Sequence, residues 1–233
     1  MLRIEGLQAS YGRGQVLFDV RLSVGRGELV TLLGRNGMGK TTTIRSIMGL
    51  VPRRWGTIEL DDQPIGGCTP EAIARRGVGL VPEGRLIFPT LTVEENLIAT
   101  AANRLGSSQV WTLNDIYRLF PRLEERRGQF GRTLSGGEQQ MLAIGRALMT
   151  NPRLVIFDEA TEGLAPAIRN EIWNCIELLK SRGHSIVVVD RNLQVLQRLA
   201  DRHYVIEKGR TVWSGSSAEM AQQAKTVHRY IGL

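Results

Sequence analysis

Apolar and polar residues alternate in the first part of the chain and gather into short apolar runs later. Between residues 2 and 24 apolar positions alternate with polar ones and are bounded by glycines, which predicts short antiparallel strands joined by tight turns. Continuous apolar runs predict buried strands of a parallel sheet, and they cover residues 29–33, 79–81, 154–157 and 185–189.

Helical periodicity follows most of these runs, so strand-then-helix units predict a parallel sheet with helices on both faces. Residues 92–150 carry no strand signal, which predicts a helical insert between two parts of the α/β core. Capping residues and apolar spacing predict the main helices at 92–102, 113–120, 135–149, 167–180, 192–200 and 218–230.

The stretch between the apolar run 29–33 and the next helix has the pattern of a phosphate-binding loop. Glycines let the backbone turn its N–H groups toward anionic oxygens, and the helix start adds further donors. Lys40 would reach the β- and γ-phosphates of a nucleotide, and the Thr41 hydroxyl would hold Mg²⁺. The predicted phosphate-binding residues are Gly34, Arg35, Asn36, Gly37, Met38, Gly39, Lys40, Thr41 and Thr42.

Two adjacent carboxylates, Asp158 and Glu159, end the apolar run 154–157. Neighbouring side chains of an extended segment point in different directions, so one acid can serve a metal and the other a water molecule. Asp158 is predicted to orient Mg²⁺ and Glu159 to polarise the water that attacks the γ-phosphorus.

A second anion-binding helix start is predicted at Ser135, Gly136 and Gly137. The serine caps the helix, and the two glycines expose its first N–H groups. Because the loop at 34–42 already provides one complete phosphate cradle, this second one is expected to serve a nucleotide held by another subunit.

Composition narrows the class of protein. The 233 residues are 42% hydrophobic, contain no run long enough to span a membrane, and begin without a signal-peptide pattern, which predicts a cytoplasmic protein. The formal charge is +7, and 26 of the 30 basic residues are arginine. A basic balance suits a phosphate-rich partner, but the arginines are spread along the chain and not interleaved with aromatic residues.

Taken together, the phosphate loop, Val81-Pro82-Glu83, Leu134-Ser135-Gly136-Gly137-Glu138-Gln139 and the paired acids resemble the ATP-binding subunit of an ABC transporter. The resemblance implies a P-loop NTPase core with a mostly parallel sheet, an N-terminal antiparallel β part and an inserted helical subdomain. We expect a single domain, with residues 1–82 and 133–233 as the core and about 83–132 as the insert. It further implies ATP and Mg²⁺ as ligands, Tyr11 stacked on adenine, and Ser135, Gly137 and Glu138 on the partner's nucleotide. From the residues alone, Tyr11 is equally a turn tyrosine packed on its own sheet.

Finer features are similar to branched-chain amino acid import ATPases, namely residues 81–89, 91–97 and 162–166. That resemblance implies integral membrane subunits, a second ATP-binding subunit, a periplasmic binding protein reached indirectly, and a peripheral place on the cytoplasmic face of the inner membrane. Docking of the membrane subunits is expected on the insert, around Ile87, Phe88 and Leu91.

Three departures from the family pattern stand out. Glu83 replaces the usual glutamine that serves Mg²⁺ and the membrane subunit, and Glu162-Gly163-Leu164-Ala165 replaces Ser-Ala-Leu-Asp. Arg191 occupies the place of the switch histidine, where it keeps a positive charge near the γ-phosphate but cannot shuttle a proton. The predicted catalytic residues are therefore Glu159, Lys40, Glu83 and Arg191, and the predicted metal residues are Thr41, Asp158 and Glu83.

Two alternatives remain open. Arg191 could leave the site slow, so that the chain would be an ATP-dependent dimerisation switch while a partner subunit turns over ATP. The basic charge also suits a soluble ABC ATPase acting on nucleic acid, although such relatives generally carry coiled-coil inserts or two ATPase domains, and no heptad run appears here. The transported solute and the choice between homodimer and heterodimer are not encoded in recognisable motifs.

Overall fold

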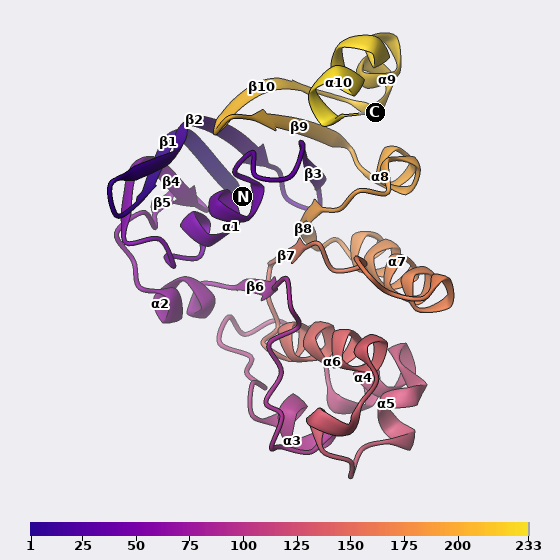
Figure 1. The fold of residues 1–233 in the computed structure, drawn as a ribbon. Coiled ribbons are helices and arrows are strands. Elements are labelled where there is room, and N and C mark those ends of the chain that lie inside the picture. Colours follow the sequence, from indigo (N-terminus) through magenta and orange to yellow (C-terminus); the bar gives the residue numbers. More distant parts are fainter. Residues whose placement is uncertain (233) are drawn as a thin grey trace. The chain divides into compact units, whose positions relative to one another are not determined.

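Residues 1–232, which the structure describes, form ten β-strands and ten α-helices in the computed structural model (Figure 1). The chain divides into two compact units. Unit 1 combines Met1–Ile73 with the chain from Lys180 onward, and unit 2 is Ala74–Leu179. The predicted helical insert lies within unit 2, which also contains two strands and two long helical segments of the predicted core; the prediction of a core with an insert stays a prediction.

Unit 1 is built on a mixed sheet in the order β5-β4-β1-β2-β10-β9-β3-β8. The antiparallel part is β1, β2, β4 and β5, of which the alternating pattern predicts the first two. In the other part β3 runs parallel to both β8 and β9, and its five residues are all buried. The strands are β1 Leu2–Tyr11, β2 Gly14–Val24, β3 Leu29–Leu33, β4 Arg53–Leu60, β5 Gln63–Pro64, β8 Ser185–Val189, β9 Arg202–Glu207 and β10 Arg210–Gly215.

The helices of unit 1 pack on this sheet, with α1 against β2 and α9 and α10 against β9. A turn at Lys208 and Gly209 joins β9 to β10, and both residues have positive φ. A side chain at 209 would collide with the Val16 carbonyl oxygen, so glycine is required there. The helices are α1 Lys40–Ile47, α8 Leu193–Leu199, α9 Ser217–Gln222 and α10 Ala224–Ile231, while α2 Pro70–Arg75 and α7 Pro166–Ser181 cross the unit boundaries.

Unit 2 is organised around α6, of whose fourteen residues ten are buried. It packs on β6, which pairs in parallel with β7, and on α3, α4 and α5. Gly145 permits this close packing, because an added Cβ would meet Ile116 and Leu97 at 2.8 Å. The elements are β6 Val78–Val81, α3 Val93–Ile98, α4 Leu113–Leu119, α5 Pro121–Glu125, the 3₁₀ turn Gly131–Thr133, α6 Gly136–Met149 and β7 Leu154–Asp158.

Two predicted helices differ from the structure. The helix that begins after Thr92 ends at Ile98, not Ala102, because the Ala102 N–H donates to the Met149 carbonyl at the end of α6. The last predicted helix is two helices, α9 and α10, which meet at Gln223, whose side chain accepts a hydrogen bond from the Trp213 indole. In both places a tertiary hydrogen bond ends a helix that the sequence pattern would continue. No helix within residues 1–232 is both long and apolar enough to cross a bilayer.

Candidate functional site

The phosphate-loop residues form a tight turn between β3 and α1. Gly34, Gly37 and Gly39 all have positive φ, the left-handed region in which other residues are strained. At Gly34 and Gly39 there is also no room for a side chain, since an added Cβ would lie 2.3 Å from the Ile206 carbonyl oxygen and 2.6 Å from Leu17. The glycines of the motif are therefore required by close packing as well as by backbone conformation.

The helix that follows starts with no side-chain cap. Its N-cap residue is Gly39, in the left-handed conformation, and glycine has no side chain with which to cap the first turn of α1. An N-cap residue without a side chain leaves the first N–H groups of a helix to other acceptors, and such a helix start can bind phosphate. Thr43 and Ser46 use their hydroxyls inside the helix, on the carbonyls of Gly39 and Thr42.

Lys40 lies folded back over the loop. Its side chain is almost fully buried, and Nζ donates to the carbonyl oxygens of Gly34 at 3.0 Å and Arg35 at 3.2 Å. A lysine ammonium has three donors and can exchange carbonyl partners for phosphate oxygens. Its position is therefore compatible with the predicted contact to the β- and γ-phosphates.

A cavity of about 300 Å³ opens beside this loop within unit 1. Arg35, Asn36 and Lys40 border it from the loop, and Arg191 borders it from the segment after β8. The backbone holds Arg191 in a turn, in which Asp190 accepts a hydrogen bond from the Asn192 N–H and the Leu193 N–H donates to the Arg191 carbonyl. The structure thus places Arg191 and Lys40, predicted from separate motifs, around one cavity.

The cavity has lining residues that the sequence motifs do not indicate. Ile231 and Gly232, at the end of α10, border it together with Asp190 and Leu193. Gly232 lies close to the Arg35 side chain, because an added Cβ would be 3.2 Å from its Nε atom. No local pattern could have identified the last helix, since its position depends on how α10 packs on β9.

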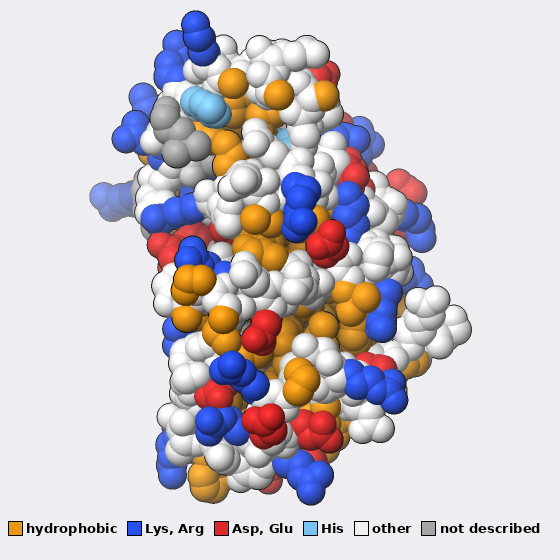
Figure 2. Space-filling model, turned by 90° about the vertical axis from the view of Figure 1, so that its right-hand side faces the viewer, with side chains coloured by type: hydrophobic (Ala, Val, Ile, Leu, Met, Phe, Trp, Pro, Cys, Tyr) orange, Lys and Arg blue, Asp and Glu red, His pale blue; other side chains and the backbone are white. Residues whose placement is uncertain are grey.

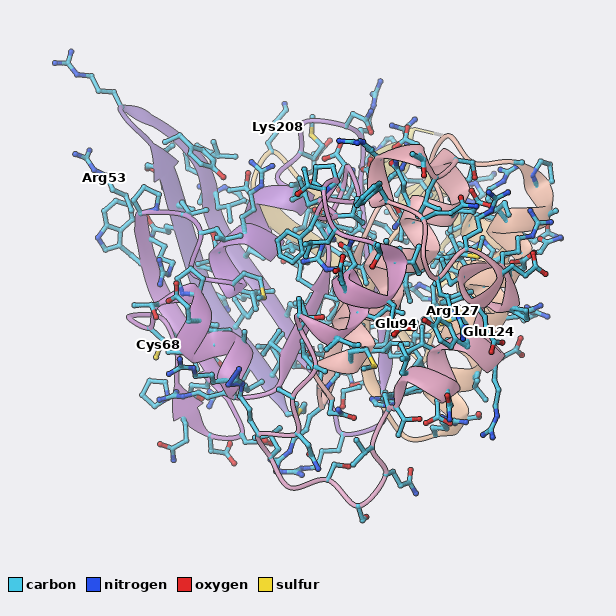
Figure 3. The ribbon with its side chains drawn as sticks, turned by 90° about the horizontal axis from the view of Figure 1, so that it is seen from below. Arg53, Cys68, Glu94, Glu124, Arg127 and Lys208 are labelled. Carbon is cyan, nitrogen blue, oxygen red and sulfur yellow. The ribbon has the colours of Figure 1, made fainter. Side chains whose placement is uncertain are left out.

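Tyr11 ends β1 at the hairpin with β2, and 41% of it is exposed. Arg53, labelled in Figure 3 at the edge of the antiparallel strands, donates to the carbonyl oxygen of Gly12 in the same hairpin. An exposed aromatic ring on a hairpin supported in this way can stack on a base. The stacking itself stays a prediction.

Asp158 and Glu159 have different surroundings within unit 2. Asp158 is the last residue of β7 and is 3% exposed, whereas Glu159 is half-buried and has a φ of 51°. The strand therefore ends before Glu159, and a turn, not strand alternation, sets its direction. A left-handed conformation costs a non-glycine residue about 1–2 kcal/mol, and such residues cluster at functional sites.

Ser135 starts α6 with a complete capping box. Its hydroxyl accepts from the Glu138 N–H at 3.3 Å, and the Glu138 carboxylate accepts from the Ser135 N–H at 2.8 Å. The two glycines between them have little free space, since an added Cβ would lie 2.7 Å from the Arg85 guanidinium at Gly136 and 3.0 Å from Ile168 at Gly137. The predicted residues Ser135, Gly136, Gly137 and Glu138 are thus assembled at one helix start.

The Glu138 carboxylate also forms an ion pair with Arg126, at 2.6 Å, and its side chain is only 6% exposed. Burial acts to raise the pKa of Glu138, but the hydrogen bonds from Ser135 and the charge of Arg126 outweigh it, so the pKa lies below the ordinary value. Glu138 is therefore a charged carboxylate whose hydrogen bond and ion pair are made to residues of unit 2. No sequence pattern indicated that Arg126 would pair with Glu138.

Glu83 follows β6 and is exposed. Two residues later Arg85 adopts a positive φ and donates to the Gln139 side chain at 3.3 Å. This loop therefore contacts the start of α6 within unit 2. Within residues 1–232 no three or more His, Cys, Asp or Glu side chains form a group that could hold a metal ion.

Comparison with known proteins agrees with this geometry. The family model described as "ABC transporter" matches residues 17–162. The chain is 40% identical to the high-affinity branched-chain amino acid transport ATP-binding protein BraG of Pseudomonas aeruginosa, over 100% of both chains. It is 35% identical to the lipopolysaccharide export system ATP-binding protein LptB of Escherichia coli, over 99% of this chain and 97% of LptB.

A solved structure described as the ATP binding subunit of an ABC transporter superposes with a TM-score of 0.82 at 30% identity, covering 97% of this chain and 94% of that one. This similarity confirms the predicted P-loop fold with its antiparallel N-terminal strands. The family match and the near-complete coverage of the relatives confirm the resemblance seen in the sequence. The chain belongs to the ABC transporter family, whose ATP-binding cassettes hydrolyse ATP to power transport.

Proposed function

We propose that this chain is the ATP-hydrolysing subunit of an importer for branched-chain amino acids or related small polar solutes. The observation that most supports this proposal is the cavity beside the phosphate loop, which both Lys40 and Arg191 border. The choice of import rests on BraG, which is 40% identical to this chain against 35% for LptB, over nearly the same coverage. Export of a larger substrate is the competing reading, because LptB also aligns along almost the whole chain.

In the proposed mechanism the phosphate loop, Lys40 and the start of α1 bind the β- and γ-phosphates of ATP. Lys40 exchanges its carbonyl partners for phosphate oxygens, and Tyr11 stacks on the adenine. Arg191, which also borders the cavity, would direct its positive charge toward the γ-phosphate. These groups stabilise the negative charge that develops during phosphoryl transfer.

Mg²⁺ would be held by the Thr41 hydroxyl, with Asp158 and Glu83 as carboxylate partners. A hydroxyl and few carboxylates suit Mg²⁺, which takes most of its remaining ligands from water and phosphate. When bound, the ion would neutralise charge on the transferring phosphoryl group. Glu159 orients and polarises the attacking water, and its turn conformation separates it from the buried Asp158.

We further propose that the start of α6, from Ser135 to Glu138, faces the nucleotide of a second ATP-binding subunit. ATP-binding cassettes of this family form dimers and work with membrane subunits, which supports this arrangement. The chain would lie at the cytoplasmic face of the inner membrane, with its membrane subunits docked around Ile87, Phe88 and Leu91. A periplasmic binding protein would supply the solute.

The test uses the complex that co-purifies with this chain from membranes. We expect Glu159→Gln to lower steady-state ATP hydrolysis by about a hundredfold or more while ATP binding is retained, since a positioned base contributes factors of that order. Equal rates in both forms would reject Glu159 as the catalytic residue. Uptake of labelled leucine in cells lacking the chain separates import from export, because only an importer loses uptake.

A non-hydrolysing role is favoured by one observation, the arginine at position 191 on the cavity wall. In that case ATP would bind and drive dimerisation while the partner subunit hydrolyses. Arg191→His would then raise the rate of ATP hydrolysis.

The nucleic-acid alternative is less well supported, because basic and acidic side chains are interspersed over the face drawn in Figure 2. Co-purification with nucleic acid in place of membrane subunits would favour it.

A further inference from the structure

The start of α6 contains a buried negative charge that the proposed function does not require. The Glu138 carboxylate accepts from the Ser135 N–H with one oxygen and pairs with Arg126 through the other. Only 6% of its side chain is exposed, against 42% for Arg126. A buried carboxylate at a phosphate-binding helix start is unfavourable unless a cation neutralises it, because it repels the phosphate and lacks water.

Arg126 is well placed for that task because its own position is fixed. It follows α5, its Nη1 donates to the Gln129 side chain at 3.0 Å, and the Gln129 N–H returns a bond to its carbonyl at 2.8 Å. The same segment accepts the first free N–H groups of α3, those of Val93 and Glu94, on the carbonyls of Gln129 and Arg127. Arg126 thus belongs to a segment that is bonded to α3, the helix that follows the proposed docking residues 87–91.

The neighbouring Arg127 has a different environment. Its charge acts on Tyr117, which donates a hydrogen bond to Glu94 and lies near Glu124. Figure 3 shows Glu94, Glu124 and Arg127 gathered on the helical part of unit 2. The two adjacent arginines therefore have different partners. Arg126 pairs with Glu138 at the start of α6, and Arg127 lies near Tyr117.

We propose that Arg126 is a positioning residue for ATP hydrolysis, which neutralises Glu138 and keeps it in the capping box so that the Ser135 hydroxyl and the first turn of α6 can receive the partner's γ-phosphate. This inference rests on the proposed function. It assigns the Glu138 carboxylate to its own helix start, while the backbone and the serine face the nucleotide. The segment that contains Arg126 also bonds to α3, next to the proposed docking residues, and so connects that region to the start of α6.

The experiment compares variants in the complex purified from membranes through a tag on this chain. Arg126→Ala leaves Glu138 charged and unpaired, so ATP hydrolysis should fall by about tenfold or more. Arg126→Lys keeps the charge and should retain most of the rate. Glu138→Gln added to Arg126→Ala removes the unpaired charge but keeps an oxygen for the Ser135 N–H, so it should restore much of the loss. Arg127→Ala is the matched control and should leave hydrolysis unchanged.

Binding of a fluorescent ATP analogue to the isolated full-length chain, with a thermal unfolding curve, checks that each variant is folded and that its own phosphate loop works. Wild-type hydrolysis in Arg126→Ala overturns the positioning role. A defect that Glu138→Gln fails to relieve also overturns it, because the loss would then come from packing and not from an unpaired charge. A wild-type chain that binds no ATP overturns the proposed function instead.

Discussion

The two glycine-containing helix starts of this chain, those of α1 and α6, are built in opposite ways. The start of α1 has glycine as its N-cap and therefore no side-chain cap from that residue. The start of α6 is closed by a reciprocal pair of hydrogen bonds between Ser135 and Glu138. Both are rich in glycine, but only the second is closed by the side chain of its own N-cap residue.

This difference indicates that two glycine-rich helix starts can have different roles toward a nucleotide. An uncapped start gives a ligand several N–H groups and suits firm binding of phosphate. A capped start is stable without a ligand and has less to gain from one. We therefore expect α1 to set the affinity for ATP and α6 to respond to a nucleotide that is already bound.

The largest effect should come from the uncapped start. Lys40→Ala removes the only lysine of the loop and should weaken ATP binding by about a hundredfold or more, because charge-assisted bonds to phosphate are lost. Titration of the purified chain with a fluorescent ATP analogue measures this. Lys225→Ala, an exposed lysine on α10, is the control and should bind normally. Unchanged affinity in Lys40→Ala would remove the contrast between the two helix starts.

A smaller effect should come from the capped start. Ser135→Ala loses a cap and a donor, so it should destabilise the fold by about 1 kcal/mol and lower hydrolysis by about tenfold, with ATP affinity unchanged. Ser216→Ala provides a matched control, because Ser216 forms the same capping box with Glu219 on α9. Both variants should lose similar stability in urea unfolding, and only Ser135→Ala should lose activity. Equal activity in the two would mean that Ser135 is only a cap.

A third effect concerns stability alone, sharpens the comparison between the units and depends on pH. His203 in unit 1 is fully buried, between the Thr31 and Ser217 hydroxyls at 2.7 and 2.8 Å. Burial lowers the pKa of His203 to about 4. The unfolded chain takes up this proton below about pH 6.5, whereas the folded chain does so only near pH 4. The free energy of unfolding should therefore decrease as the pH is lowered from about 6.5 toward 4, by at most about 1.4 kcal/mol per pH unit.

Urea unfolding between pH 7.5 and 4.5, with hydrogen exchange read for each unit, measures this effect. Unit 1 should open first as the pH falls. His203→Phe cannot titrate and should flatten the slope while lowering stability at neutral pH. An unchanged slope in that variant would assign the acid sensitivity to other groups.

Much of the fold was predictable because it follows from local chemistry. Thr92 and Ser135 were identified as N-caps from the residues around them, and both form complete capping boxes. The apolar runs at 29–33 and 185–189 became fully buried strands at the same bounds. The phosphate loop was equally predictable, since its glycines adopt the positive φ angles that other residues avoid.

Features that depend on distant contacts were not predictable. The early end of α3 depends on a bond to Met149, and the break before α10 involves the Trp213 indole. α5 lies outside the helices that the sequence pattern predicts, although Pro121 starts a helix there. Glu159 was expected to continue the strand, but it leaves β7 in a left-handed turn.

The sequence by itself determined the family, the parallel core and the two helix starts, because glycine spacing, capping residues and apolar runs act over a few neighbouring residues. Only the tertiary structure decided what surrounds them. It placed Arg191 and the end of α10 on the cavity beside Lys40, and it paired Arg126 with Glu138. Such pairings depend on how the elements pack. The partner of a charged side chain cannot be read from its sequence neighbours, because tertiary packing decides which distant residue lies beside it.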